Sequence, residues 1–147
     1  MADNIAFVRS LYEAWNARDF ERGAEAMAAD GTITIAGTGD VFEGADGSRA
    51  YSASWANGFP DGQITVDNIF ADGDKVVVEF TGRGTHTGIL ETSMGSIPAT
   101  GRSMAIKLCD VVQLRDQKIV SQTSYFDTGS MMAQLGLLPE QIGSEQQ

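Results

Sequence analysis

The chain has 147 residues, of which 42% are hydrophobic and 20% charged, a size and composition typical of one globular domain spanning residues 1–147. The net charge of −10 repels phosphate groups, which argues against nucleic acid and anionic membranes as partners. The chain has one cysteine, Cys109, and one histidine, His86. These counts exclude an intrachain disulfide and a clustered Cys/His metal site.

No apolar run approaches the roughly 20 residues that a membrane-spanning helix needs. The N-terminal sequence Met1-Ala2-Asp3-Asn4 lacks the basic start of a signal peptide. We therefore expect a cytoplasmic protein.

Helical periodicity dominates the first sixty residues. Asp3 can cap a first helix, whose apolar stripe includes Tyr12 and Trp15. Asp19 can cap a second, short helix with Met27 on its buried side and an end at residues 30–31. A short strand is expected at residues 32–35, and a third helix at about residues 46–57.

The rest of the sequence reads as strands, predicted at residues 63–70, 75–85, 102–115 and 118–126. Residues 72–74 and 116–117 are hairpin turns, and residues 87–101 are expected to form an unstructured loop that could cover a pocket. Asp127 can cap a closing helix that Gly136 ends, and residues 143–147 are expected to be frayed. Helices followed by strands indicate an α+β fold, a curved antiparallel sheet wrapped around the N-terminal helices as a cone.

Asp110 is the most informative residue, because it is a carboxylate within an apolar strand. Alternation places it on the same face as Leu108 and Val112. Burial there would raise its pKa, as a general acid or base at neutral pH requires. The alternative is a structural carboxylate that is hydrogen-bonded to a neighbouring strand or helix end.

His86 is the second candidate catalytic residue, since its usual pKa near 6.5 suits a proton shuttle. A structural hydrogen bond at the sheet edge explains it equally well. Tyr51 could offer its hydroxyl to a substrate carbonyl. Polar and aromatic side chains on the third helix and the last two strands are further candidates for substrate binding: Tyr51, Trp55, Phe59, Leu108, Gln122, Ser124 and Phe126.

Four segments, in order along the chain, resemble the SnoaL-like polyketide cyclases of the nuclear transport factor 2-like superfamily. They are Tyr12–Asp19 at the end of the first helix, Gly84–Gly88 at a strand end, Ile97–Arg102 at a strand entry, and Lys118–Val120 with Tyr125–Asp127 on the last strand. The resemblance implies a cone-shaped fold, a pocket for a hydrophobic carbonyl compound, acid–base chemistry without a cofactor, and a homodimer formed through the outer face of the sheet.

The resemblance also exposes a difference. The family's catalytic Asp on the last strand corresponds to Ser124 in this sequence, and the standard carboxylates of limonene epoxide hydrolases and ketosteroid isomerases are not matched either. Asp110 falls near the position where the polyketide cyclases place a pocket-facing His, so a carboxylate on the neighbouring strand could reach the same cavity.

Two functional hypotheses follow. The first is a small cofactor-independent enzyme in which Asp110 moves a proton next to the carbonyl of an apolar substrate, as a cyclase, an isomerase or a retro-aldol lyase. The alternative is a non-catalytic module of the same fold that binds a small ligand or forms dimers, which the Ser at position 124 favours.

Overall fold

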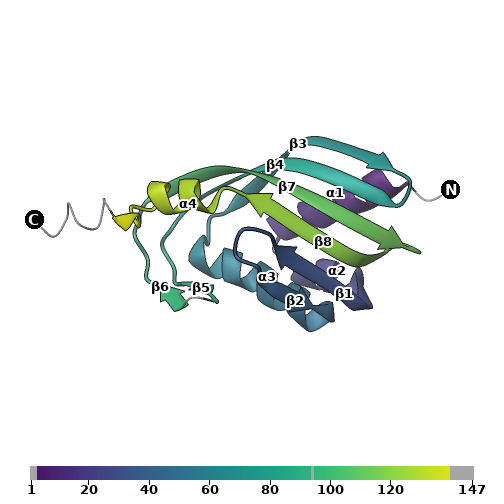
Figure 1. The fold of residues 1–147 in the computed structure, drawn as a ribbon, viewed down its shortest axis with the longest axis horizontal. Coiled ribbons are helices and arrows are strands. Elements are labelled where there is room, and N and C mark those ends of the chain that lie inside the picture. The colour runs from purple at the N-terminus through teal and green to yellow at the C-terminus, as the bar shows by residue number, and fades with distance from the viewer. Residues whose placement is uncertain (1–2, 94, 140–147) are drawn as a thin grey trace, which may run out of the picture.

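A computed structural model describes residues 3–93 and 95–139, and Figure 1 shows its fold. The helices are α1 (Asn4–Asn16), α2 (Phe20–Glu25), α3 (Gly44–Gly58) and α4 (Thr128–Gln134). The strands are β1 (Met27–Ile35), β2 (Val41–Glu43), β3 (Gln63–Asp72), β4 (Lys75–Thr85), β5 (Leu90–Thr92), β6 (Gly95–Ile97), β7 (Ser103–Arg115) and β8 (Lys118–Phe126).

Six strands form one sheet in the order β2-β1-β8-β7-β4-β3. Neighbouring strands are antiparallel, except that β1 runs parallel to β8. Figure 1 shows α1, α2 and α3 together on one side of this curved sheet, with α4 at the end near the C-terminus. The predicted α+β architecture with a curved, largely antiparallel sheet is confirmed.

The predicted start signals of three helices are confirmed. The carboxylates of Asp3, Asp19 and Asp127 accept hydrogen bonds from backbone N–H groups in the first turns of α1, α2 and α4. Each cap satisfies a backbone donor that has no partner within its helix. The turn between β7 and β8 has positive φ at Asp116 (51°) and Gln117 (56°), as a two-residue hairpin loop requires.

Side-chain alternation along β7 decides which residues face the helices. Every second residue from Met104 to Leu114 is buried, and Asp110 is one of them, with 1% of its surface exposed. The predicted face of Asp110 is therefore confirmed. The opposite face of the sheet carries half-exposed aromatic side chains, including Phe70 and Tyr125.

The predicted end of the second helix is wrong. Helix α2 ends at Glu25, and Met27 begins β1 instead of lying on the helix. Strand pairing overrides the helical pattern here, because Met27 pairs with Ile119 of β8. A Cβ at Gly31 would lie 2.3 Å from the carbonyl oxygen of Ile119, so this approach of β1 to β8 requires glycine.

The segment from residue 87 to 101 is not an unstructured loop. Residues of β5 and β6 pair as a small hairpin, and Leu90 is buried in the core. Gly88 donates its N–H to the carbonyl of Gly58 at the end of α3, which anchors the segment. The predicted fraying of residues 143–147 lies outside the described residues. Among the described helices, none has the length and apolar character needed to cross a membrane.

Candidate active site

The concave side of the sheet and the helices packed on it form the walls of a partly open cavity of about 140 Å³. Residues from α1, α3, β4, β7 and β8 contribute to its wall. Most of the wall is apolar, and its aromatic members are Tyr12, Trp15, Tyr51, Trp55, Phe59 and Phe80. An apolar cavity with a few convergent polar groups is the usual form of a small-molecule site.

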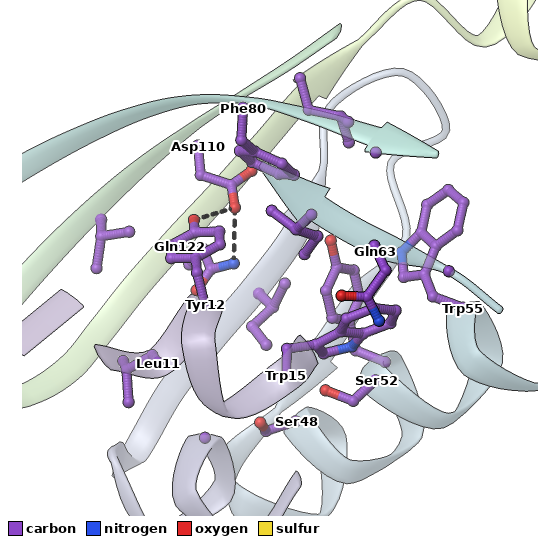
Figure 2. A pocket seen from close by; sticks show the side chains of 18 of the residues that line it. Leu11, Tyr12, Trp15, Ser48, Ser52, Trp55, Gln63, Phe80, Asp110 and Gln122 are labelled. Atoms are coloured by element: carbon purple, nitrogen blue, oxygen red, sulfur yellow. Dashed lines mark hydrogen bonds between the residues drawn. The ribbon is translucent and has the colours of Figure 1, made fainter. Parts of the chain in front are cut away.

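Asp110 is the carboxylate of this cavity (Figure 2). Its Oδ2 atom accepts a hydrogen bond from the hydroxyl of Tyr12 on α1 over 2.5 Å, and a second from Nε2 of Gln122 on β8 over 3.2 Å. Its Oδ1 atom has no hydrogen-bond partner within the described part of the chain. One oxygen is thus held by two donors, and the other is buried without a partner.

Burial raises the pKa of Asp110 from 3.8 to about 6, because the charged form loses its hydration. Hydrogen bonds from Tyr12 and Gln122 and the nearby Ser124 offset part of this increase. A carboxyl group with such a pKa is present in both protonation states close to neutral pH. It can therefore accept a proton and return it, as general acid–base catalysis needs.

Ser124 lies close to both Asp110 and Tyr51. It is paired directly across the sheet from Asp110, and its hydroxyl lowers the pKa of both Asp110 and Tyr51 without meeting hydrogen-bond geometry to either. Burial, followed by the charge of Asp110, raises the pKa of Tyr51 above its usual value. Tyr51 thus keeps its proton at neutral pH and stays a hydrogen-bond donor.

Most of the predicted substrate-binding residues line the cavity: Tyr51, Trp55, Phe59, Leu108 and Gln122. The other two are not in its wall. Ser124 is fully buried and lies next to Asp110 on the neighbouring strand, and Phe126 packs edge-on against Trp55 with ring centres 5.7 Å apart. Phe126 therefore supports an aromatic wall residue from outside the cavity.

His86 lies elsewhere and does not line the cavity. Its ring packs on Phe59 with centres 5.3 Å apart, and its Nδ1 accepts the N–H of Thr100 over 3.2 Å. Burial lowers the pKa of His86, and its Nε2 has no partner among the described residues. The structure therefore does not bring the two candidate catalytic residues, Asp110 and His86, together.

The apolar stripe of the first helix, as predicted from the sequence, includes Tyr12 and Trp15, and both line the cavity. The signal for Tyr12 was present: a tyrosine in a buried helical stripe needs a partner for its hydroxyl, and a buried Asp needs a donor. Ser48 and Ser52 of α3 also line the cavity and were missed. Their i, i+4 spacing alone does not indicate which side of the helix faces a ligand.

Charged side chains are scarce around the site. Of the lining residues, Asp110 and Arg83 carry charge, and Arg83 is exposed. Within residues 3–93 and 95–139, no group of three or more His, Cys, Asp or Glu side chains is arranged to hold a metal ion.

Solved structures similar to this one include IdmH, a proposed polyketide cyclase from Streptomyces antibioticus. It is 30% identical, the match covers 92% of this chain and 99% of that chain, and the TM-score is 0.75. A proposed SnoaL-like polyketide cyclase from Jannaschia sp. CCS1 has 22% identity, coverage of 92% and 93%, and a TM-score of 0.80. An LEH-like epoxide hydrolase from M. tuberculosis has 20% identity, coverage of 90% and 88%, and a TM-score of 0.68.

A comparison with curated proteins finds no match. The sequence profile of the SnoaL-like polyketide cyclases matches residues 5–135, a range that contains every residue lining the cavity. The chain belongs to the SnoaL-like polyketide cyclase family.

Proposed function

We propose that this protein is a cofactor-independent acid–base enzyme that acts on a neutral, hydrophobic carbonyl compound. Membership of the SnoaL-like family and the likeness to IdmH support a cyclase-like enzyme in general. The observation that carries the finer proposal is Asp110, a buried carboxyl in an apolar cavity with one oxygen held and the other unpartnered.

In the proposed reaction, Oδ1 of Asp110 removes a proton from the carbon next to the substrate carbonyl. The electron pair of that C–H bond moves to the carbonyl oxygen and forms an enolate. Tyr51 donates a hydrogen bond to this developing oxyanion. Trp55 and Ser124 each offset part of the increase that burial causes in the pKa of Tyr51, and the hydroxyl keeps its proton and can donate it in a hydrogen bond.

The enolate then has two fates, depending on the substrate. Attack on a second carbonyl carbon of the same molecule closes a ring, and Asp110 returns its proton to the new alkoxide. Return of the proton to a different carbon gives an isomer instead. Both outcomes need the same first step, so proton removal is the step to test.

The test is deuterium exchange at the carbon next to the carbonyl of 1-tetralone, a bicyclic ketone, in D2O by proton NMR. We expect the wild-type protein to accelerate exchange, with a rate that rises as the pH passes about 6, where Asp110 loses its proton. Asp110→Asn should lower the rate by about 100-fold or more, the usual contribution of a positioned general base.

The matched control is Asp67→Asn, because Asp67 is a carboxylate outside the cavity wall that is bonded to Thr81 and Lys107. This variant should exchange at the wild-type rate. A wild-type protein that binds 1-tetralone without accelerating exchange, or an Asp110→Asn variant with full activity, would overturn the enzyme proposal.

The second candidate is a non-catalytic carrier of the same kind of ligand. The observation in its favour is Ser124, which stands where the family resemblance leads us to expect a catalytic Asp. A carrier binds 1-tetralone with no exchange above that of the buffer, and Asp110→Asn then affects affinity alone.

A further inference from the structure

Helix α3 directs two serine side chains into the cavity. Ser48 and Ser52 are four residues apart and therefore lie on one face of the helix. They are 5% and 9% exposed, and both line the cavity. A pair of serines at these positions is notable, because alanine would fill nearly the same space in a mostly apolar wall and favour the helix more.

Two other helical serines, Ser10 and Ser54, bond to the backbone of their own helix. Ser10 donates to the carbonyl of Phe7 over 2.6 Å, and Ser54 donates to the carbonyl of Tyr51 over 2.8 Å. Within the described residues, the hydroxyls of Ser48 and Ser52 have no such partner. Buried hydroxyls are normally hydrogen-bonded, so these two have unused capacity that faces the cavity.

The serines lie far from the carboxylate. Figure 2 shows Ser48 and Ser52 on the helical side of the cavity, Asp110 with Tyr12 and Gln122 on the other, and Trp15 between them in this view. The cavity therefore has two polar ends separated by an aromatic middle. A ligand that fills it can form hydrogen bonds at both ends while its centre packs against aromatic rings.

The surroundings of the serines define the group that they would bind. A hydroxyl both donates and accepts a hydrogen bond, and neither charged lining residue, Asp110 or Arg83, belongs to α3. Gly23 of α2 also lines the cavity, and a Cβ at that position would lie 3.5 Å from Oγ of Ser48. The missing side chain leaves room beside this hydroxyl for an uncharged oxygen.

We infer that Ser48 and Ser52 form a second subsite, which binds a hydroxyl or carbonyl oxygen at the end of the ligand opposite the reacting carbonyl. The inference rests on the proposed function, because it takes the reacting carbonyl to lie at Asp110. It narrows the substrate class to uncharged compounds with a ring-like apolar centre and oxygen groups at both ends.

The test compares the affinities of 1-tetralone and its 5-, 6- and 7-hydroxy derivatives at pH 6.5, where the phenols are uncharged. Tryptophan fluorescence is the readout, since the chain has two tryptophans and both line the cavity. We expect at least one hydroxy derivative to bind about fivefold to tenfold more tightly than 1-tetralone, as one added hydrogen bond provides.

The double variant Ser48→Ala/Ser52→Ala should lose this preference and keep the wild-type affinity for 1-tetralone. Gly23→Ala should reduce the preference by filling the space beside Ser48, and it protects the test against a folding defect in the double variant. Ser54→Ala is the matched control, because the Ser54 hydroxyl already donates to the backbone carbonyl of Tyr51. This variant should keep the full preference for the hydroxy derivative.

The inference is overturned if the wild type prefers no hydroxy derivative, or if the preference survives in the double variant. Deuterium exchange separates this failure from failure of the proposed function. Exchange that depends on Asp110, without a hydroxyl preference, refutes the subsite alone. A preference that depends on the serines, without exchange, refutes the enzyme alone.

Discussion

Asp110 and His86 are both buried and ionisable, but they lie in different environments. Asp110 is on the wall of the cavity, with donors on one oxygen and none on the other. His86 lies beyond the end of β4, with its ring on Phe59 and Nδ1 on the backbone of Thr100. Burial raises the pKa of the first and lowers that of the second.

Both shifts favour the uncharged form, because burial penalises charge of either sign. The consequence differs with the type of group. Asp110 is brought close to neutral pH, where it can exchange a proton, whereas His86 is kept neutral at pH 7 and cannot easily gain one. Burial by itself thus does not identify a site, and neither does a buried polar atom without a partner, because both residues have one. Position on the cavity wall distinguishes Asp110 from His86.

The largest expected effect concerns stability and pH. In the unfolded chain Asp110 titrates near 3.8 and in the folded chain near 6, so between these values the folded state binds more protons. Wild-type stability therefore falls as the pH rises through this range, by about 3 kcal/mol in total. The unfolding free energy of Asp110→Asn, measured with urea, should therefore increase relative to that of the wild type by about the same amount between pH 4 and pH 8.

Asp67→Asn is the control, because its effect on stability should change with pH in the opposite direction. The hydrogen bond from Thr81 lowers the pKa of Asp67. The stabilisation that this carboxylate provides is therefore present at neutral pH and is lost as the pH falls below the usual pKa of an aspartate. Replacing it should destabilise the protein more at neutral than at acidic pH. If the difference between Asp110→Asn and the wild type did not vary with pH, Asp110 would have an ordinary pKa.

The second prediction addresses His86. His86→Leu keeps most of the packing volume but leaves the Thr100 N–H without its acceptor, and we expect a loss of up to about 2 kcal/mol in unfolding free energy. Exchange of 1-tetralone should stay within about threefold of the wild type, because His86 does not line the cavity. If folded His86→Leu protein exchanged 1-tetralone as slowly as Asp110→Asn does, the conclusion that His86 takes no part in the reaction would be wrong.

The third prediction concerns the donor that holds Asp110. Tyr12→Phe removes the hydrogen bond to Oδ2, which favours the carboxylate, so the pKa of Asp110 should rise above 6 by about one pH unit. Carbon-13 NMR of the aspartate carboxyl group measures this directly. Tyr125→Phe, at a half-exposed tyrosine, should leave the titration unchanged. An unchanged pKa in Tyr12→Phe would mean that Tyr12 does not stabilise the charged form.

Local sequence signals predicted much of the fold. Capping aspartates, apolar periodicity and hairpin turns depend on neighbouring residues, and the predictions for α1, α3 and the long strands are confirmed for that reason. The end of α2 was wrong because Met27 is held by pairing with β8, almost one hundred residues further along the chain. The small hairpin of β5 and β6 was missed because three-residue strands carry little periodicity.

The candidate site divides in the same way. Alternation along one strand was sufficient to place Asp110 on the buried face, since side chains in a strand alternate whatever lies above them. Its partners were not predictable from that pattern, because Tyr12 lies 98 positions away in the sequence. Ser48 and Ser52 could be recognised as cavity residues only from the packing of α3. The sequence alone thus determined which carboxylate is buried. The tertiary structure decided which atoms hold it, which of its oxygens lacks a partner, and that His86 lies outside the cavity, because those features depend on how distant segments pack.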